Sequence, residues 1–70
     1  RHREALGVYE AALVHDPLDE AQHRGAIRCW LALGEPAAAR RAYERCREQL
    51  RAGLGVAPAA ATEALLAAAR

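Results

Sequence analysis

Two histidines and several carboxylates lie close to Pro17 in the sequence, and they are the first residues to consider for catalysis or metal binding. His15 and His23 flank the Asp16–Pro17 step, and Asp19 and Glu20 lie between them. Imidazole and carboxylate groups could together bind a metal ion or share general acid–base work. A helical metal site uses histidines four residues apart plus a third ligand, and this spacing is absent. We therefore expect His23 to be packed or hydrogen bonded near the turn.

The remaining reactive residues provide no second candidate for catalysis. Cys29 and Cys46 lack the CxxC spacing of redox and metal sites, so we expect two reduced thiols, with a disulfide between facing helices as the alternative. The acidic residues are accompanied by no glycine-rich phosphate loop and no pairing of a nucleophile with a base. The sequence thus predicts a protein that is not an enzyme and that uses no cofactor and no metal.

Arginine is concentrated in the segment 36–52, where basic residues outnumber acidic ones. The basic residues are Arg40, Arg41, Arg45, Arg47 and Arg51, and the acidic ones are Glu44 and Glu48. Such a strip could contact phosphates. However, opposite charges three positions apart can pair along a helix, and no aromatic residues interleave to stack on bases. We predict a solvated face, with a protein-docking surface and a nucleic-acid contact as the alternatives.

The elements that must position these residues are indicated by an internal repeat. The triplet Ala5, Tyr9 and Ala12 recurs 34 positions later as Ala39, Tyr43 and Cys46. Spacings of four and three place each triplet on one helix face, in the order small, large, small. A period of 34 residues is typical of stacked helical hairpins, in which neighbouring units cover one another's apolar faces. The repeat predicts an all-α fold of antiparallel helical hairpins.

Proline, glycine and capping residues divide the first half of the chain into two predicted helices. The first covers about residues 3–15 and ends at Asp16–Pro17, because proline cannot continue the hydrogen-bond ladder. The second begins at Asp19, a good N-cap with Gln22 as its capping-box partner, and ends at Gly34. The short connections predict that successive helices are antiparallel neighbours.

Two further helices are predicted in the second half. The third begins at Pro36, where a missing N–H is harmless, and we expect Gly53 to stop it. Pro58 introduces a last helix, to about residue 69, which should cap the stack. In the loop between them, we expect at least one of Leu54 and Val56 to tuck against a helix.

The predicted core is thin because most apolar residues are alanine. Trp30 is the largest apolar group, and we predict it at the centre of the helix-pair core. Leu65 and Leu66 would pack from the last helix. The third helix should turn five residues inward, namely Ala39, Ala42, Tyr43, Cys46 and Leu50.

Composition narrows the classes of partner. The chain has 70 residues and a net charge of +1, so bulk charge does not argue for a nucleic acid or a membrane surface. No run is long and apolar enough to span a bilayer. The chain opens in mid-pattern, with the second helix of a hairpin, so we expect a segment of a longer, cytoplasmic protein.

Two motifs resemble the tetratricopeptide repeat over about 50 residues. They are Ala5-x3-Tyr9-x2-Ala12-Leu13-x2-Asp16-Pro17 and Trp30-x3-Gly34-x4-Ala39-x3-Tyr43-x2-Cys46. The sequence departs from that repeat at His23, where a tryptophan is usual, and at Ile27, where a small residue is usual. The resemblance implies that residues 1–17 are the second helix of a preceding repeat, 18–53 a complete hairpin, and 54–70 a loop and capping helix.

A sharper resemblance covers residues 16–58. Its segments are Asp16-Pro17-Leu18-Asp19-Glu20, His23-Arg24, Ala42-Tyr43-Glu44-x2-Arg47 and Leu54-Gly55-Val56-x-Pro58. In this order they resemble the C-terminal half of the bacterial transcriptional activator domain of SARP-type regulators. That family implies regulation of transcription through a protein partner or self-association. DNA would be bound by an upstream domain outside this chain, and neither a membrane nor a small-molecule ligand is implied.

The candidate partner-contact residues come from two helices. The resemblance places the first helix of each hairpin on an inner binding face, which singles out His23, Arg24 and Arg28. The arginine strip adds Arg41 and Arg45. Two alternatives share the fold: a generic tetratricopeptide scaffold that docks a peptide or partner protein, and a regulatory segment attached to a sensor ATPase.

Overall fold

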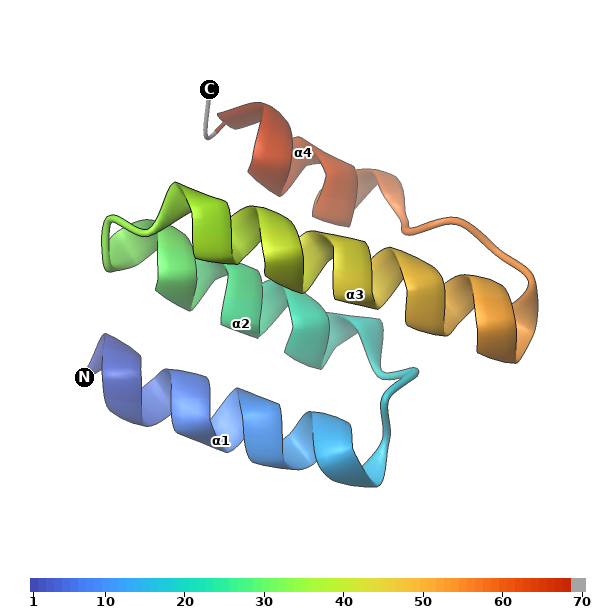
Figure 1. Ribbon diagram of the computed structural model, residues 1–70, viewed down its shortest axis with the longest axis horizontal. Coiled ribbons are helices and arrows are strands. Elements are labelled where there is room, and N and C mark those ends of the chain that lie inside the picture. The colour runs from blue at the N-terminus through green and yellow to red at the C-terminus, as the bar shows by residue number, and fades with distance from the viewer. Residues whose placement is uncertain (69–70) are drawn as a thin grey trace.

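Four α-helices joined by short connections form the computed structural model, which describes residues 1–68 (Figure 1). The helices are α1 (His2–His15), α2 (Glu20–Ala32), α3 (Pro36–Leu54) and α4 (Ala60–Ala68). The described residues contain no strand. The predicted all-α fold of antiparallel hairpins is therefore confirmed.

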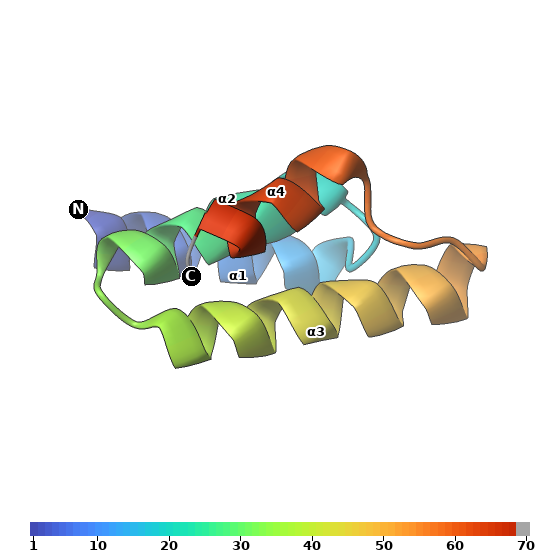
Figure 2. The ribbon, with the colours of Figure 1, turned by 90° about the horizontal axis from the view of Figure 1, so that it is seen from above.

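The α2 helix has the other three helices as neighbours. It packs between α1 and α3, each antiparallel to it, and α4 packs on both α2 and α3 (Figures 1 and 2). The α1 and α3 helices do not pack against each other. The predicted antiparallel pairs are thus confirmed, and α4 lies over the second pair, as expected of a cap.

The turn between α2 and α3 is built from the expected residues. Gly34 adopts φ 72°, in the left-handed region where a side chain is disfavoured. Behind it, the Glu35 N–H donates to the Trp30 carbonyl at 2.9 Å, which closes the end of α2. Pro36 is the first residue of α3, so its missing N–H costs no helical hydrogen bond.

The end of α3 corrects two expectations. The helix runs through Gly53 to Leu54, and Gly55, at φ 67°, is the residue that ends it. Gly53 instead lies inside the helix, under Leu18: a Cβ there would lie 2.6 Å from Leu18 Cδ2, the far end of a flexible side chain. Leu54 and Val56 are both exposed, so the prediction that one of them tucks against a helix was wrong. Leu54 is the last residue of α3, and Val56 follows the cap residue Gly55.

The start of α2 also differs from the prediction. Asp19 is the N-cap residue, but its side chain makes no capping hydrogen bond, so the capping box with Gln22 does not form. The Asp19 backbone carbonyl accepts from the Gln22 and His23 N–H groups instead. Asp16 shapes the turn, since its Oδ1 accepts from the Leu18 N–H at 3.1 Å.

The start of α4 falls two residues later than expected. Pro58 lies in the connection, and the helix itself begins at Ala60. The predicted end of this helix, near residue 69, lies outside the described residues.

The core consists of two clusters that meet at one tryptophan. One cluster contains Ile27, Ala39, Ala42 and Tyr43, and the other contains Leu6, Ala26 and Cys29. Trp30 packs against both but stays half-buried, and the most completely buried large side chains are Ile27 and Leu50. The five inward residues predicted on α3 are all buried. Trp30 thus joins the clusters at their boundary, and its Nε1 has no partner among the described residues.

One close contact between α1 and α2 depends on a glycine. Tyr9 lies directly over Gly25, where a Cβ would come within 2.5 Å of the tyrosine Cζ. The predicted face of α1, on which Tyr9 lies between two small residues, therefore packs against a position of α2 that has no side chain. This contact fixes the distance between two helices that form one wall and the floor of the groove described next.

Candidate interaction surfaces

The predicted partner-contact residues lie on different surfaces. Arg28 on α2 and Arg41 and Arg45 on α3 are exposed, whereas Arg24 is half-buried beneath α4 and His23 is buried. Two of the five, His23 and Arg45, line the same groove. The structure therefore does not gather the five into one patch.

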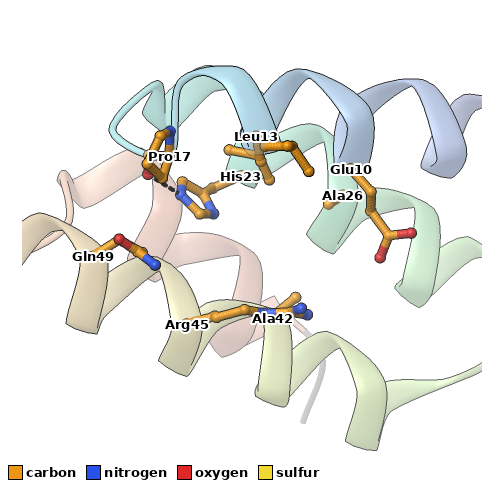
Figure 3. A pocket seen from close by; sticks show the side chains of 9 residues that line it. Glu10, Leu13, Pro17, His23, Ala26, Ala42, Arg45 and Gln49 are labelled. Carbon is orange, nitrogen blue, oxygen red and sulfur yellow. Dashed lines mark hydrogen bonds between the residues drawn. The ribbon is translucent and has the colours of Figure 1, made fainter.

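This groove lies between α1 and α3, with α2 as its floor (Figure 3). Its volume is about 280 Å³. The lining comes from α1, the following turn, α2 and α3, namely Glu10, Leu13, Val14, Pro17, His23, Ala26, Ala42, Arg45 and Gln49. Because α1 and α3 do not pack against each other, and small alanines line the floor (Ala26) and the α3 wall (Ala42), a space remains open between the two walls.

His23 is the buried polar group of this groove. Its side chain is 4% exposed, and its Nε2 lies 2.7 Å from the Pro17 carbonyl oxygen. The ring thereby ties the start of α2 to the turn that precedes it, which agrees with the prediction of a hydrogen-bonded histidine near the turn. The other ring nitrogen, Nδ1, is directed toward α3 (Figure 3).

The walls of the groove carry opposite charges. Glu10 comes from α1 and Arg45 from α3, and both are exposed (Figure 3). Neither has an oppositely charged partner within 4 Å among residues 1–68. Both groups are therefore available to charges that approach from outside the described chain.

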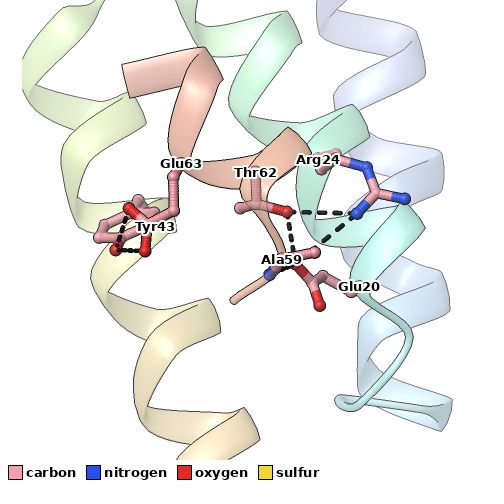
Figure 4. Close-up of polar contacts among 6 residues, drawn as sticks. All are labelled: Glu20, Arg24, Tyr43, Ala59, Thr62 and Glu63. Carbon is pink, nitrogen blue, oxygen red and sulfur yellow. Dashed lines mark hydrogen bonds and ion pairs between the residues drawn. The ribbon is translucent and has the colours of Figure 1, made fainter. Parts of the chain in front are cut away.

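A separate polar cluster attaches α4 to α2. The Glu20 carboxylate accepts from the Thr62 hydroxyl at 2.5 Å and from the Ala59 N–H at 2.7 Å (Figure 4). Arg24 donates to Thr62 at 3.2 Å and lies 3.6 Å from Glu20. Burial alone would raise the pKa of Glu20, but the hydrogen bonds from Thr62 and Ala59 and the Arg24 charge outweigh it, so the pKa is lowered.

A second contact attaches α4 to α3. The Tyr43 hydroxyl donates to the Glu63 carboxylate, at 2.7 Å from Oε1 and 2.8 Å from Oε2 (Figure 4). Burial and this hydrogen bond raise the pKa of Tyr43 to about 12. The α4 helix is thus attached to both α2 and α3, and Arg24 takes part in the attachment to α2.

The arginine strip on α3 is partly paired. Glu48 and Arg51 form a close pair at 2.6 Å, and Glu44 and Arg47 lie 3.6 Å apart. The hydrogen bond within the first pair lowers the pKa of Glu48 and raises that of Arg51. All four side chains are more than half exposed, which supports the prediction of a solvated face.

The described residues offer little else for chemistry. Cys29 and Cys46 are buried free thiols, and burial raises the pKa of Cys46 to about 11, which leaves it protonated at neutral pH. Across residues 1–68, no three histidine, cysteine or acidic side chains come close enough to hold a metal ion. No helix in the same range is long and apolar enough to cross a membrane.

Sequence reasoning missed the two contacts of α4 and the groove itself. Thr62 is the only threonine of a chain without serine, so a hydroxyl in an alanine run was an available signal. Its partner Glu20 lies 42 positions away in the chain, and the residues around Glu20 give no indication of this contact. The groove could not be found from periodicity, because Ala26 and Ala42 read equally well as plain core residues.

The fold defined here is an all-α domain of antiparallel hairpins with a capping helix and an open groove. A family model described as the bacterial transcriptional activator domain matches residues 1–70, the whole chain, so the chain belongs to this family. It is accordingly a domain of the type found in transcriptional activators. No curated protein and no solved structure matches the chain.

Proposed function

We propose that this domain acts by binding a partner protein or a second copy of itself, and that it is not the part of the regulator that reads DNA. The observation that carries the proposal is the groove between α1 and α3, which presents apolar side chains and unpaired charges together. Val14, on its rim, is 82% exposed. Exposed apolar side chains bordered by polar groups are typical of protein interaction sites.

Charge argues against a direct role in DNA binding. The chain has a net charge of +1, and Arg47 and Arg51 on α3 are paired with glutamates of the same helix. A DNA-binding surface gains most of its affinity from unpaired basic side chains on phosphates. DNA binding would then belong to a further domain of a longer, cytoplasmic regulator.

The partner contacts proposed from the sequence fit this role unequally. Arg28, Arg41 and Arg45 are exposed and free to meet a partner. His23 would act from within the groove, and Arg24 through its hold on α4. Residues 1–17 and 18–53 would form the two walls and the floor, and residues 54–70 the cap.

The proposal is tested in the complete regulator with Val14→Ser and Val8→Ser. Both valines are exposed on α1, but only Val14 lines the groove. We expect Val14→Ser to reduce transcription from a reporter at least about fivefold, because an apolar contact with the partner is lost. Affinity for promoter DNA and protein abundance should not change, and Val8→Ser should behave as the wild type.

Two results would contradict the proposal. One is equal activation by all three proteins. The other is binding of a DNA duplex by the 70-residue chain alone, with an affinity that falls steeply between 50 and 200 mM salt as phosphate contacts require.

A further inference from the structure

We propose that the groove between α1 and α3 is the contact face of a symmetric dimer, in which Glu10 of each copy pairs with Arg45 of the other. The inference rests on the proposed function and chooses, between its two kinds of partner, a second copy of this chain. It begins from the two charged side chains that line the groove, because each carries the charge that the other requires.

The two charges lie on opposite walls, and neither is used within the chain. Glu10 comes from α1 and Arg45 from α3, and both are exposed (Figure 3). Neither takes part in an ion pair within 4 Å among residues 1–68. A surface that presents one free carboxylate and one free guanidinium can pair both of them with an identical surface, provided that the two meet in opposite order.

The directions of the helices place the two charges at nearly the same level of the groove. The α1 and α3 helices are both antiparallel to α2, so they run parallel to each other (Figure 1). Glu44, the residue before Arg45, lies 34 positions after Glu10 and is its equivalent in the internal repeat. Glu10 and Arg45 are therefore separated across the groove rather than along it.

This arrangement favours one way of joining two copies. If the grooves meet face to face about a two-fold axis that runs along the groove, α1 of one copy lies over α3 of the other. Each Glu10 then meets an Arg45, and the same contact is made twice. An axis across the groove would bring α1 over α1 and α3 over α3, and neither ion pair would form.

The apolar residues and the size of the face also fit a dimer. Val14, which is 82% exposed, and its neighbour Leu13 line the groove and would be covered. The groove lies on the side where α1, α2 and α3 are next to one another, and the two longer extents of the molecule are 31 and 27 Å (Figures 1 and 3). A face of this size can provide the roughly 800 Å² per partner that a specific interface buries.

Sedimentation equilibrium of the 70-residue chain tests the inference through charge reversal. We expect the wild-type chain to dimerise reversibly as its concentration rises. Glu10→Arg and Arg45→Glu should each weaken dimerisation at least about tenfold, because two like-charge contacts replace two ion pairs. Arg41→Glu makes the same change of charge on α3 outside the groove and should dimerise as the wild type does. All three positions are exposed, so helix content measured by circular dichroism should not change.

Mixing the two weakened variants identifies the pair. The Glu10→Arg chain has arginine at both positions, and the Arg45→Glu chain has glutamate at both. An equimolar mixture should therefore form a heterodimer within about threefold of the wild-type affinity, although neither variant dimerises well alone. The double variant Glu10→Arg/Arg45→Glu should recover dimerisation for the same reason. A wild-type chain that stays monomeric up to about 1 mM, or a mixture that does not associate, would overturn the inference.

The two proposals fail in different ways. If the chain stays monomeric but Val14→Ser still lowers transcription, the interaction role stands and the partner is a different protein. If the charge reversals behave as expected but Val14→Ser leaves transcription unchanged, the dimer forms through the groove but does not serve activation.

Discussion

At the scale of single residues, this domain relies on a few side chains that each join two helices. Tyr43 is the clearest case, because its ring belongs to the core cluster and its hydroxyl holds Glu63 of α4. His23 does the same for the turn after α1 and the start of α2. In an alanine-rich chain with few large side chains, such residues account for a large share of the specific contacts.

Tyr43 should make the domain sensitive to alkaline pH. The folded state keeps the phenolic proton to about pH 12, whereas an ordinary tyrosine loses it near 10.0. A group whose pKa is raised on folding contributes stability below its unfolded pKa, and this stability is lost as the pH rises from about 10 to about 12. Urea unfolding at several pH values should show the decline.

Tyr43→Phe separates this contribution from others. We expect it to lower the free energy of unfolding by about 1–2 kcal/mol at pH 7, because the hydrogen bonds to Glu63 are lost. Its stability should then fall less steeply above pH 10. The pKa of Cys46 is also raised, to about 11, so this thiol contributes the same pH dependence to the stability of both proteins. Equal slopes for the two proteins would show that the Tyr43 proton is not linked to folding.

A pair of glycine substitutions contrasts two close approaches. Gly25→Ala should cost about 1–3 kcal/mol, because the new methyl meets a packed tyrosine ring. Gly53→Ala meets the flexible end of Leu18 and gains up to about 1 kcal/mol of helix propensity, so it should be nearly neutral. Thermal unfolding by circular dichroism would compare them, and a larger loss for Gly53→Ala would refute this packing argument.

At the scale of elements, α4 is the shortest helix among the described residues. It has nine residues, and Thr62 is its one buried side chain. Leu65 and Leu66 are half-buried and pack against the core cluster that contains Ile27 and Tyr43, as predicted. The remaining attachment comes from the polar cluster of Glu20, Arg24 and Thr62, and from the contact of Tyr43 with Glu63. A short helix held this way opens more readily than the paired helices beneath it.

Thr62→Val should release α4 selectively. The side chain keeps its shape but loses the hydrogen bonds to Glu20 and Arg24, and leaves that carboxylate without its hydroxyl donor. We expect amide exchange in Ala60–Ala68 to accelerate about tenfold or more, while the core of α2 exchanges as before. Uniform acceleration across all four helices would instead indicate that α4 unfolds only with the whole domain.

The elements also show how far sequence alone reaches. The number of helices, their order, the turn at Gly34 and Pro36 and the inward face of α3 follow from local signals. The exact helix ends do not: Gly53 and Gly55 could each end α3 by their local sequence, and it is Gly55 that adopts the left-handed conformation and ends it. Glu20 and Asp19 are likewise both suited to a helix start, and it is α4 that engages Glu20.

At the scale of the molecule, the shape explains why so little is buried. The extents are 31 × 27 × 16 Å, and the shortest is less than two helix diameters of about 10–12 Å each. The helices therefore form a thin slab, and most side chains lie near a surface. Apolar residues such as Val8 and Val14 stay exposed because no further layer covers them.

The whole molecule should respond weakly to salt. The net charge of +1 causes little repulsion within the chain, and the exposed ion pairs on α3 contribute little attraction. Screening of these charges by salt therefore changes stability little. We expect the free energy of unfolding to change by less than about 0.5 kcal/mol between 0.05 and 0.5 M NaCl. A loss above about 1 kcal/mol would show that the surface pairs contribute substantially to stability.

The central place of α2 sets how freely the sequence can vary. With neighbours on three sides, this helix buries His23, Gly25, Ala26, Ile27 and Cys29, whereas α1 buries Leu6 alone. Random mutagenesis with selection for folded protein should therefore find few accepted replacements between residues 23 and 29. The outer side of α1 should accept many, which leaves it free to diverge toward new partners without loss of the fold.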